Sequence, residues 1–245
     1  MLQTIAPRRT TSPGLGWFSL ATGIVTLITF AIAVTTPPRS GPFCTSDCIG
    51  PPYTDAAQFV PRDYVWMYPA LVVAVLFLGL VIAIETHAVA AGRVVLARTA
   101  TGLGTIATAT LAITYGLQLT VAQPKLARGE TDGLGLLTQY NPDGLFIGLE
   151  NVGYTGMALA FLLMGLAIEP SRRPDRVLRW ILVIGGFATV IALVLLSVAF
   201  GSDLSYRYEV TAIALSWLTM ALAAATLAWQ HLRPVLSRAG GRRSR

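Results

Sequence analysis

The sequence predicts an all-α fold, a polytopic bundle of six transmembrane helices. Of the 245 residues, 54% are hydrophobic and only 12% are charged, and the mean hydropathy is +0.63. A soluble domain carries about 25% charged residues, so half that proportion, confined to short islands, indicates that lipid covers most of the surface. Six apolar runs are each long enough to cross a bilayer, which takes roughly 20 helical residues.

The six apolar runs set the expected domain organisation. They occupy residues 15–36, 64–89, 99–121, 145–168, 177–200 and 209–232. Because lipid offers no hydrogen-bond partners to a backbone, each run is expected to be helical. We therefore expect an N-terminal segment (1–14), a six-helix domain (15–232) and a basic tail (233–245), with long connections at 37–63 and 122–144.

Two of the runs differ from the others in composition, which predicts their place in the bundle. The run at 99–121 is rich in Gly, Ala and Thr, which favour close helix packing, and is expected at the bundle centre. The run at 177–200 is almost uniformly apolar and is expected to face lipid widely.

Asp63 is expected to cap the second helix, and Asn141 followed by Pro142 is expected to start the fourth.

Basic residues are distributed unevenly between the connections, which predicts the orientation. With the amino terminus inside, thirteen lie on the inner side: Arg8, Arg9, Arg93, Arg98, Arg172, Arg173, Arg176, Arg179, Arg233, Arg238, Arg242, Arg243 and Arg245. Five lie outside: Arg39, Arg62, Lys125, Arg128 and Arg207. The positive-inside rule then places both termini in the cytoplasm of a multi-pass protein of the inner (plasma) membrane. The arginines form no face on a folded domain, so nucleic acid is not an expected partner.

The first candidate site lies in the outer half of the bundle. Glu150 is about two turns inside the fourth helix, beside Asn151, and Tyr154 shares its face at i+4. The outer ends of the other runs add Tyr68, Tyr115, Gln118 and Glu209. A carboxylate at this depth is costly unless it faces protein or water, so we expect a polar, aromatic-lined cavity that binds a small molecule or cation. The alternative is an interfacial aromatic belt with a buried hydrogen-bond network that fixes helix packing.

A second candidate site lies at the inner ends of the helices. Glu85, His87, Glu169 and His231 close three helices that run in the same direction, so they are expected at similar depth. Two imidazoles and two carboxylates could hold zinc or non-haem iron, and a bis-histidine haem is conceivable. Glu85 and His87 point to different helical faces, however, and no H-E-x-x-H motif occurs. Interfacial side chains that reach toward the headgroups are the alternative, without any cofactor.

The only cysteines, Cys44 and Cys48, lie in the first outer connection. In an oxidising compartment a local disulfide is expected, and it would stiffen this connection modestly. A redox-active pair would more often have the spacing C-x-x-C.

Two segments resemble a group of small six-span bacterial membrane proteins: FVPRDYVWMYPAL at 59–71 and LLTQYNPDGLFIGLENVGY at 136–154. The resemblance implies the same six-helix bundle in a bacterial inner membrane. It brings no activity, substrate or catalytic residue. Both segments lie at the outer ends of helices, where the first candidate site is expected.

Three kinds of function remain open at this point. The first is binding or transport of a small solute or cation, with Glu150 as the key carboxylate. The second is an accessory or structural role beside another membrane subunit, and the third is a metal-dependent membrane enzyme that uses His87 and His231. No G-x-S-x-G, Walker or dinucleotide motif occurs, and no lysine lies in the middle of a run.

Overall fold

The computed structural model describes residues 12–54 and 61–242, and within these ranges it contains helices and loops but no strand. The α-helices are α1 (Pro13–Val34), α2 (Met67–Ala90), α3 (Val94–Leu117), α4 (Gln123–Ala127), α5 (Leu145–Ala167), α6 (Arg173–Phe200) and α7 (Leu204–Arg242). Shorter elements are η1 (Gly41–Phe43), η3 (Pro61–Asp63), the π-helix η4 (Gln118–Ala122) and η5 (Gly201–Asp203). The predicted all-helical class is confirmed. Most of the predicted N-terminal segment and the last residues of the tail, 1–11 and 243–245, lie outside the described residues.

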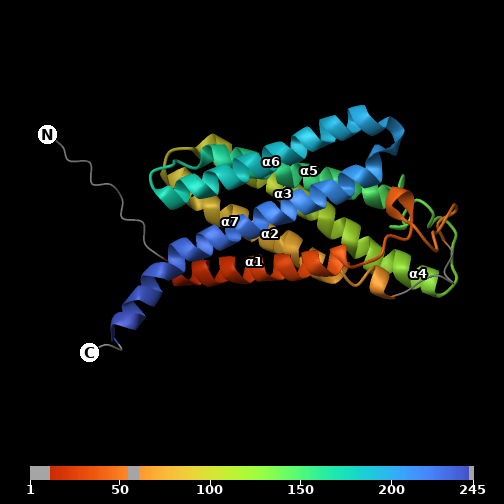
Figure 1. The fold of residues 1–245 in the computed structure, drawn as a ribbon, viewed down its shortest axis with the longest axis horizontal. Helices are drawn as coiled ribbons and strands as arrows, with labels where there is room; N and C mark the ends of the chain where they lie inside the picture. Colours follow the sequence, from red (N-terminus) through yellow and green to blue (C-terminus); the bar gives the residue numbers. More distant parts are fainter. Residues whose placement is uncertain (1–11, 55–60, 243–245) are drawn as a thin grey trace.

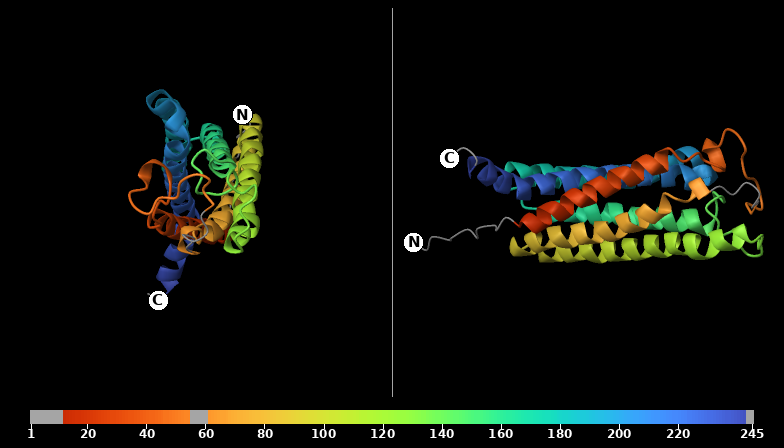
Figure 2. Two further views of the ribbon diagram at one scale, coloured as in Figure 1. Left: turned by 90° about the vertical axis from the view of Figure 1, so that its right-hand side faces the viewer. Right: turned by 90° about the horizontal axis from the view of Figure 1, so that it is seen from below.

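The long helices lie side by side along the longest axis of the molecule (Figure 1). α1 begins and α7 ends at one end of the bundle, which we call the inner end, and the loops before α2 and α5 lie at the opposite, outer end (Figure 2). Five segments of the described chain are long and apolar enough to cross a membrane. The last of them, Arg173–Pro234, has 62 residues and contains α6, η5 and most of α7. Gly201, with φ of 54°, ends α6 where the chain reverses into α7.

Glycines allow α5 to pack closely against its neighbours. α5 contacts α2, α3, α6 and α7. A Cβ atom at Gly153 would lie 2.6 Å from Leu111 of α3, and one at Gly165 would lie 2.9 Å from the backbone nitrogen of Val183 in α6. The bundle centre is therefore α5. The expectation for residues 99–121 was wrong, because α3 packs on α2 and α5 and exposes Ile106 and Ile113.

The apolar helix α6 lies at the periphery, as its composition predicts. It packs against α5 and α7, and its outward face exposes Trp180, Ile184, Phe187 and Val198. An apolar side chain exposed in this way is stable only where lipid or another protein covers it. The prediction of a peripheral position is confirmed.

The two predicted helix-start signals do not cap helices. α2 begins at Met67 after Trp66, without a side-chain cap, because the Asp63 carboxylate instead accepts a hydrogen bond from Tyr140. α5 begins at Leu145 after Gly144. The side-chain oxygen of Asn141 accepts from the backbone N–H of Asp143 and so closes the turn that precedes the helix.

The third run continues further than its hydropathy indicates. After α3 the chain makes the π-helix η4, in which the Gln123 N–H donates to the Gln118 carbonyl, and then α4 ends at Ala127. Pro124 explains the wider turn, since its ring would clash with the carbonyl of Thr120 in a regular α-helix. The second outer connection thus begins about one and a half turns later than expected.

Gly186 tests the close packing of α6 on α5. A Cβ at this position would meet the carbonyl oxygen of Ala158 and would lie 2.7 Å from the backbone nitrogen of Leu162. Because backbone atoms cannot move aside, Gly186→Ala should lower the free energy of unfolding by about 1–3 kcal/mol. Gly102→Ala is the matched control, since nothing lies within 4 Å of that Cβ. Thermal unfolding in mild detergent checks both variants, and equal melting temperatures would contradict the packing described.

Candidate functional site

Three helices bring polar side chains together in the outer half of the bundle. We call the residues Tyr115 of α3, Glu150 and Tyr154 of α5, and Glu209 of α7 the outer cluster. Glu150 and Tyr115 are 0% exposed, Tyr154 is 1% and Glu209 is 5%. Glu150 and Tyr154 lie one turn apart on α5 and share the face that meets α3, so the predicted i+4 relation holds.

Short hydrogen bonds join three members of the outer cluster. The Tyr115 hydroxyl donates to Glu150 Oε1 at 2.7 Å. It also lies 2.7 Å from the Tyr154 hydroxyl. A phenol has one hydrogen to donate, and that of Tyr115 goes to the carboxylate, so Tyr154 is the donor to Tyr115. The chain of two tyrosines therefore directs its hydrogens toward Glu150.

Glu209 places a second carboxyl group beside the first. The Glu209 and Glu150 carboxyl groups are within hydrogen-bonding reach of each other. The Oε2 atom of each is buried and has no hydrogen-bond partner among the described residues. Two buried carboxylates in contact repel each other unless a proton or a cation lies between them. The pair is therefore suited to hold a positive charge.

A cavity of about 190 Å³ reaches the outer cluster from the outer end. Glu209 forms part of its wall, and Phe30, Trp66, Ile147 and Ile213 are among the residues that line it with apolar surface. Glu150 does not line this cavity, and its side chain lies behind that of Glu209. The cavity thus combines apolar and aromatic walls with two carboxylates, Glu209 and the Asp63 group that is paired with Arg39.

An ion pair between a partly exposed arginine and a buried aspartate closes the outer side of the cavity. Arg39 Nε lies 3.4 Å from Oδ2 of Asp63, which is 4% exposed, and the Tyr140 hydroxyl donates to the same oxygen at 3.0 Å. Burial, and then the charge of Asp63, raise the pKa of Tyr140, so this phenol remains a donor at any physiological pH. Gln139 adds a hydrogen bond from its side-chain nitrogen to the Asp63 carbonyl at 3.3 Å.

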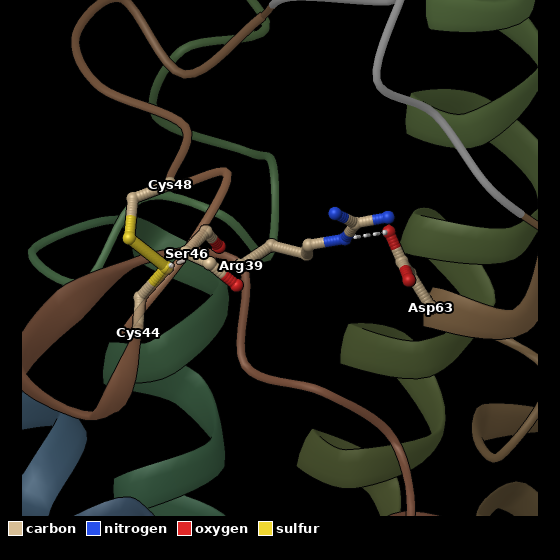
Figure 3. Close-up of a disulfide and its surroundings, with 5 residues drawn as sticks. All are labelled: Arg39, Cys44, Ser46, Cys48 and Asp63. Atoms are coloured by element: carbon tan, nitrogen blue, oxygen red, sulfur yellow. Dashed lines mark hydrogen bonds and ion pairs between the residues drawn. A yellow bond between two sulfur atoms is a disulfide. The ribbon is translucent and has the colours of Figure 1, made fainter.

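The predicted disulfide lies next to this ion pair. Cys44 and Cys48 are bonded, which confirms the sequence expectation (Figure 3). The Ile49 N–H donates to the Arg39 carbonyl at 2.7 Å. This hydrogen bond ties the disulfide loop to Arg39, the residue that pairs with Asp63. The first outer connection therefore positions the Arg39 side chain at the mouth of the cavity.

Three further residues that were predicted for the outer site do not take part in the hydrogen bonds of the outer cluster. The Asn151 side chain donates to the Ser205 carbonyl at 3.0 Å and fastens α7 to α5. Gln118 is 1% exposed and lies in η4, where its amide has no hydrogen-bond partner among the described residues. Tyr68 is 56% exposed and points away from the cluster.

Sequence reasoning missed Arg39, Tyr140 and Trp217 as parts of the site. Trp217 packs edge-to-face on Tyr154, with ring centroids 6.3 Å apart. Its position two turns after Glu209 on α7 was the available signal. Arg39 and Tyr140 lie in loops, and no local pattern indicates that both meet Asp63.

The inner candidate residues are brought together only in part. The rings of His87 and His231 stack with centroids 6.0 Å apart, and the Ser12 N–H donates to Nδ1 of His231. Glu85 accepts a hydrogen bond from Thr101, and Glu169 is exposed just after α5. In the described part of the chain, no three His, Cys, Asp or Glu residues form a metal-binding group. The inner metal or haem site stays a prediction.

Comparison with known proteins gives no family for this chain. No family model, no curated protein and no solved structure matches it. The resemblance of residues 59–71 and 136–154 to six-span bacterial proteins therefore stays a prediction. These segments contain Asp63, Trp66, Tyr140, Ile147 and Glu150, which line the cavity or lie directly behind it.

Tyr115 tests whether the outer cluster is a hydrogen-bonded unit. Tyr115→Phe removes the donor to Glu150 and the acceptor for Tyr154, so it should lower the free energy of unfolding by about 1–3 kcal/mol. Tyr68→Phe is the matched control, because its hydroxyl is on an exposed side chain, and it should be neutral. Thermal unfolding in detergent compares the two. A Tyr115→Phe variant as stable as Tyr68→Phe would refute the proposed role of the hydroxyl.

Proposed function

We propose that the chain is an integral protein of a bacterial inner membrane with six spans and both termini in the cytoplasm. α6 has 28 residues and α7 has 39, so each exceeds the roughly 20 needed for a crossing. The reversal at Gly201 supports counting them as separate spans. An even number of spans agrees with the position of the start of α1 and the end of α7, which both lie at the inner end of the bundle.

Reporter fusions test this topology. Green fluorescent protein fused after Arg245 should fluoresce, because it folds in the cytoplasm, and alkaline phosphatase fused after Gly129 or Gly201 should be active outside it. With α6 and α7 as one span, the two ends of the chain would lie on opposite sides. Phosphatase activity at the carboxyl end, with fluorescence at the amino end, would contradict six spans.

We further propose that the outer cavity binds a small amphipathic cation, such as a protonated amine with an apolar tail. The observation that carries this proposal is the buried Glu209 carboxyl in a mainly apolar wall. Its Oε2 atom has no hydrogen-bond partner among the described residues, whereas the Asp63 carboxylate of the same wall is paired with Arg39. A carboxylate favours a cation over a neutral solute. The rings of Phe30, Trp66 and Tyr206 add surfaces on which a cation or an alkyl chain can pack.

In this proposal the roles of the two carboxyl groups differ. Glu209 contacts the bound cation, and Glu150 holds the Glu209 carboxyl from behind while Tyr115 fixes Glu150 in place. A cation bound at Glu209 would replace a proton shared by the pair, so binding would release a proton. Binding is the step that a receptor and a transporter have in common.

Hexylammonium and hexanol form a matched pair of probes, because they differ mainly in charge. Saturating hexylammonium should raise the melting temperature of the detergent-purified protein by several degrees, as ligand binding to the folded state does, and hexanol should not. Glu209→Gln should abolish the difference between the probes. Glu169→Gln removes an exposed carboxylate at the inner end and should retain it. Equal responses of the wild type to both probes would reject a cation site.

A further inference from the structure

A long apolar groove runs between α6 and α7 on the inner half of the molecule. It consists of two adjoining hollows of about 590 and 790 Å³, and both are lined by Arg173, Val177, Ile181 and Leu222. We call it the α6–α7 groove. It is separate from the outer cavity, which is lined by residues at the opposite end of α7.

The floor of the groove is closed by direct contact between the two helices. A Cβ at Gly185 of α6 would lie 2.6 Å from Cγ2 of Thr219 in α7, so no space remains between the backbones there. The walls toward the inner end are the side chains of Val177, Ile181 and Leu222. The groove is therefore a shallow apolar channel on the surface and does not lead into the bundle.

Positive charge gathers at the inner end of the groove. Arg173 and Arg176 reach it from the start of α6, and Arg233 reaches it from α7. Asp175, the acid nearest to them in sequence, is 5% exposed and does not line the groove. Three guanidinium groups beside an apolar channel match the two parts of an anionic lipid, whose phosphate is negative and whose acyl chain is apolar.

Two tryptophans border the groove, one on each helix. Trp180 is 53% exposed and Trp229 is 61% exposed, and the Arg233 guanidinium lies 5.4 Å from the Trp229 ring centroid. Exposed tryptophans favour the depth at which headgroups meet acyl chains. This places the arginines at headgroup level and Leu222 at the level of the chains.

We propose that the α6–α7 groove binds an anionic phospholipid. Its phosphate lies between Arg173, Arg176 and Arg233, and one acyl chain lies along Val177, Ile181 and Leu222. Arginine at the cytoplasmic ends of spans is a general feature of membrane proteins, so charge alone does not make a site. Arg93 and Arg98 are also exposed at the inner end, on α3 or just before it, but they line neither hollow. The convergence of three arginines on one apolar channel distinguishes the groove.

Native mass spectrometry of the detergent-purified protein, titrated with phosphatidylglycerol or phosphatidylcholine, tests the proposal. The wild type should retain phosphatidylglycerol at least about tenfold more strongly. The double variant Arg173→Gln/Arg233→Gln should lose this preference, and Arg93→Gln/Arg98→Gln, which removes the same charge elsewhere, should keep it. Equal retention of both lipids by the wild type, or equal loss in both double variants, would overturn the site.

A second variant distinguishes a lipid whose acyl chain occupies the groove from a phosphate that is bound by the arginines alone. Leu222→Trp fills the channel and leaves the arginines in place, so it should weaken phosphatidylglycerol binding without affecting thermal unfolding in lipid-free detergent. Inorganic phosphate should not displace the lipid from the wild type. Full retention of phosphatidylglycerol by a folded Leu222→Trp protein, or displacement by inorganic phosphate, would show that the acyl chain is not bound in the groove.

Discussion

Glu150 and Glu209 bury their carboxyl groups against each other in a bundle whose outward surface is apolar. Taking a carboxylate out of water costs several kcal/mol unless donors or a counter-charge replace the water. Tyr115 supplies one donor, and the apolar surroundings offer few others. Glu150, Glu209 and Tyr115 come from α5, α7 and α3. The need to bring these three side chains together therefore fixes how each helix is rotated about its axis. Their remaining apolar faces are then turned outward or toward α1, α2 and α6.

At the outer end of the bundle, loop residues contact another buried carboxylate in the same way. Arg39 and Tyr140 come from different connections, and both reach the buried Asp63 carboxylate. The disulfide loop fastens Arg39, so the first connection forms a structured lining for the cavity. The cavity therefore has the Glu209 carboxylate on its wall and the Arg39–Asp63 ion pair at its outer side. Within the described part of the chain, Oε2 of Glu209 has no hydrogen-bond partner, and this directs the functional proposal toward a positively charged ligand.

Hydropathy was sufficient to predict apolar helices, and cysteine spacing was sufficient to predict the disulfide. A carboxylate inside an apolar run was sufficient to single out Glu150, which is 0% exposed. Each of these predictions depends on residues close together in sequence. The i+4 pair Glu150 and Tyr154 follows from helical geometry alone. The rotation of each helix could not be predicted, since lipid-facing and buried positions are both apolar here. That is why Tyr68 points outward and α5 replaces α3 at the centre. Tyr140, one of the two partners of Asp63, is 77 residues away in sequence, and no local signal identifies it.

A double-mutant cycle between Tyr115 and Glu150 tests the central claim most directly. Tyr115→Phe, Glu150→Leu and the double variant are compared by unfolding in the same detergent. The hydrogen bond of 2.7 Å between a phenol and a buried carboxyl group predicts that the two substitutions are strongly non-additive. The expected coupling is about 1–3 kcal/mol. Additivity to within about 0.5 kcal/mol would mean that the two side chains do not interact, and it would contradict the outer cluster as described.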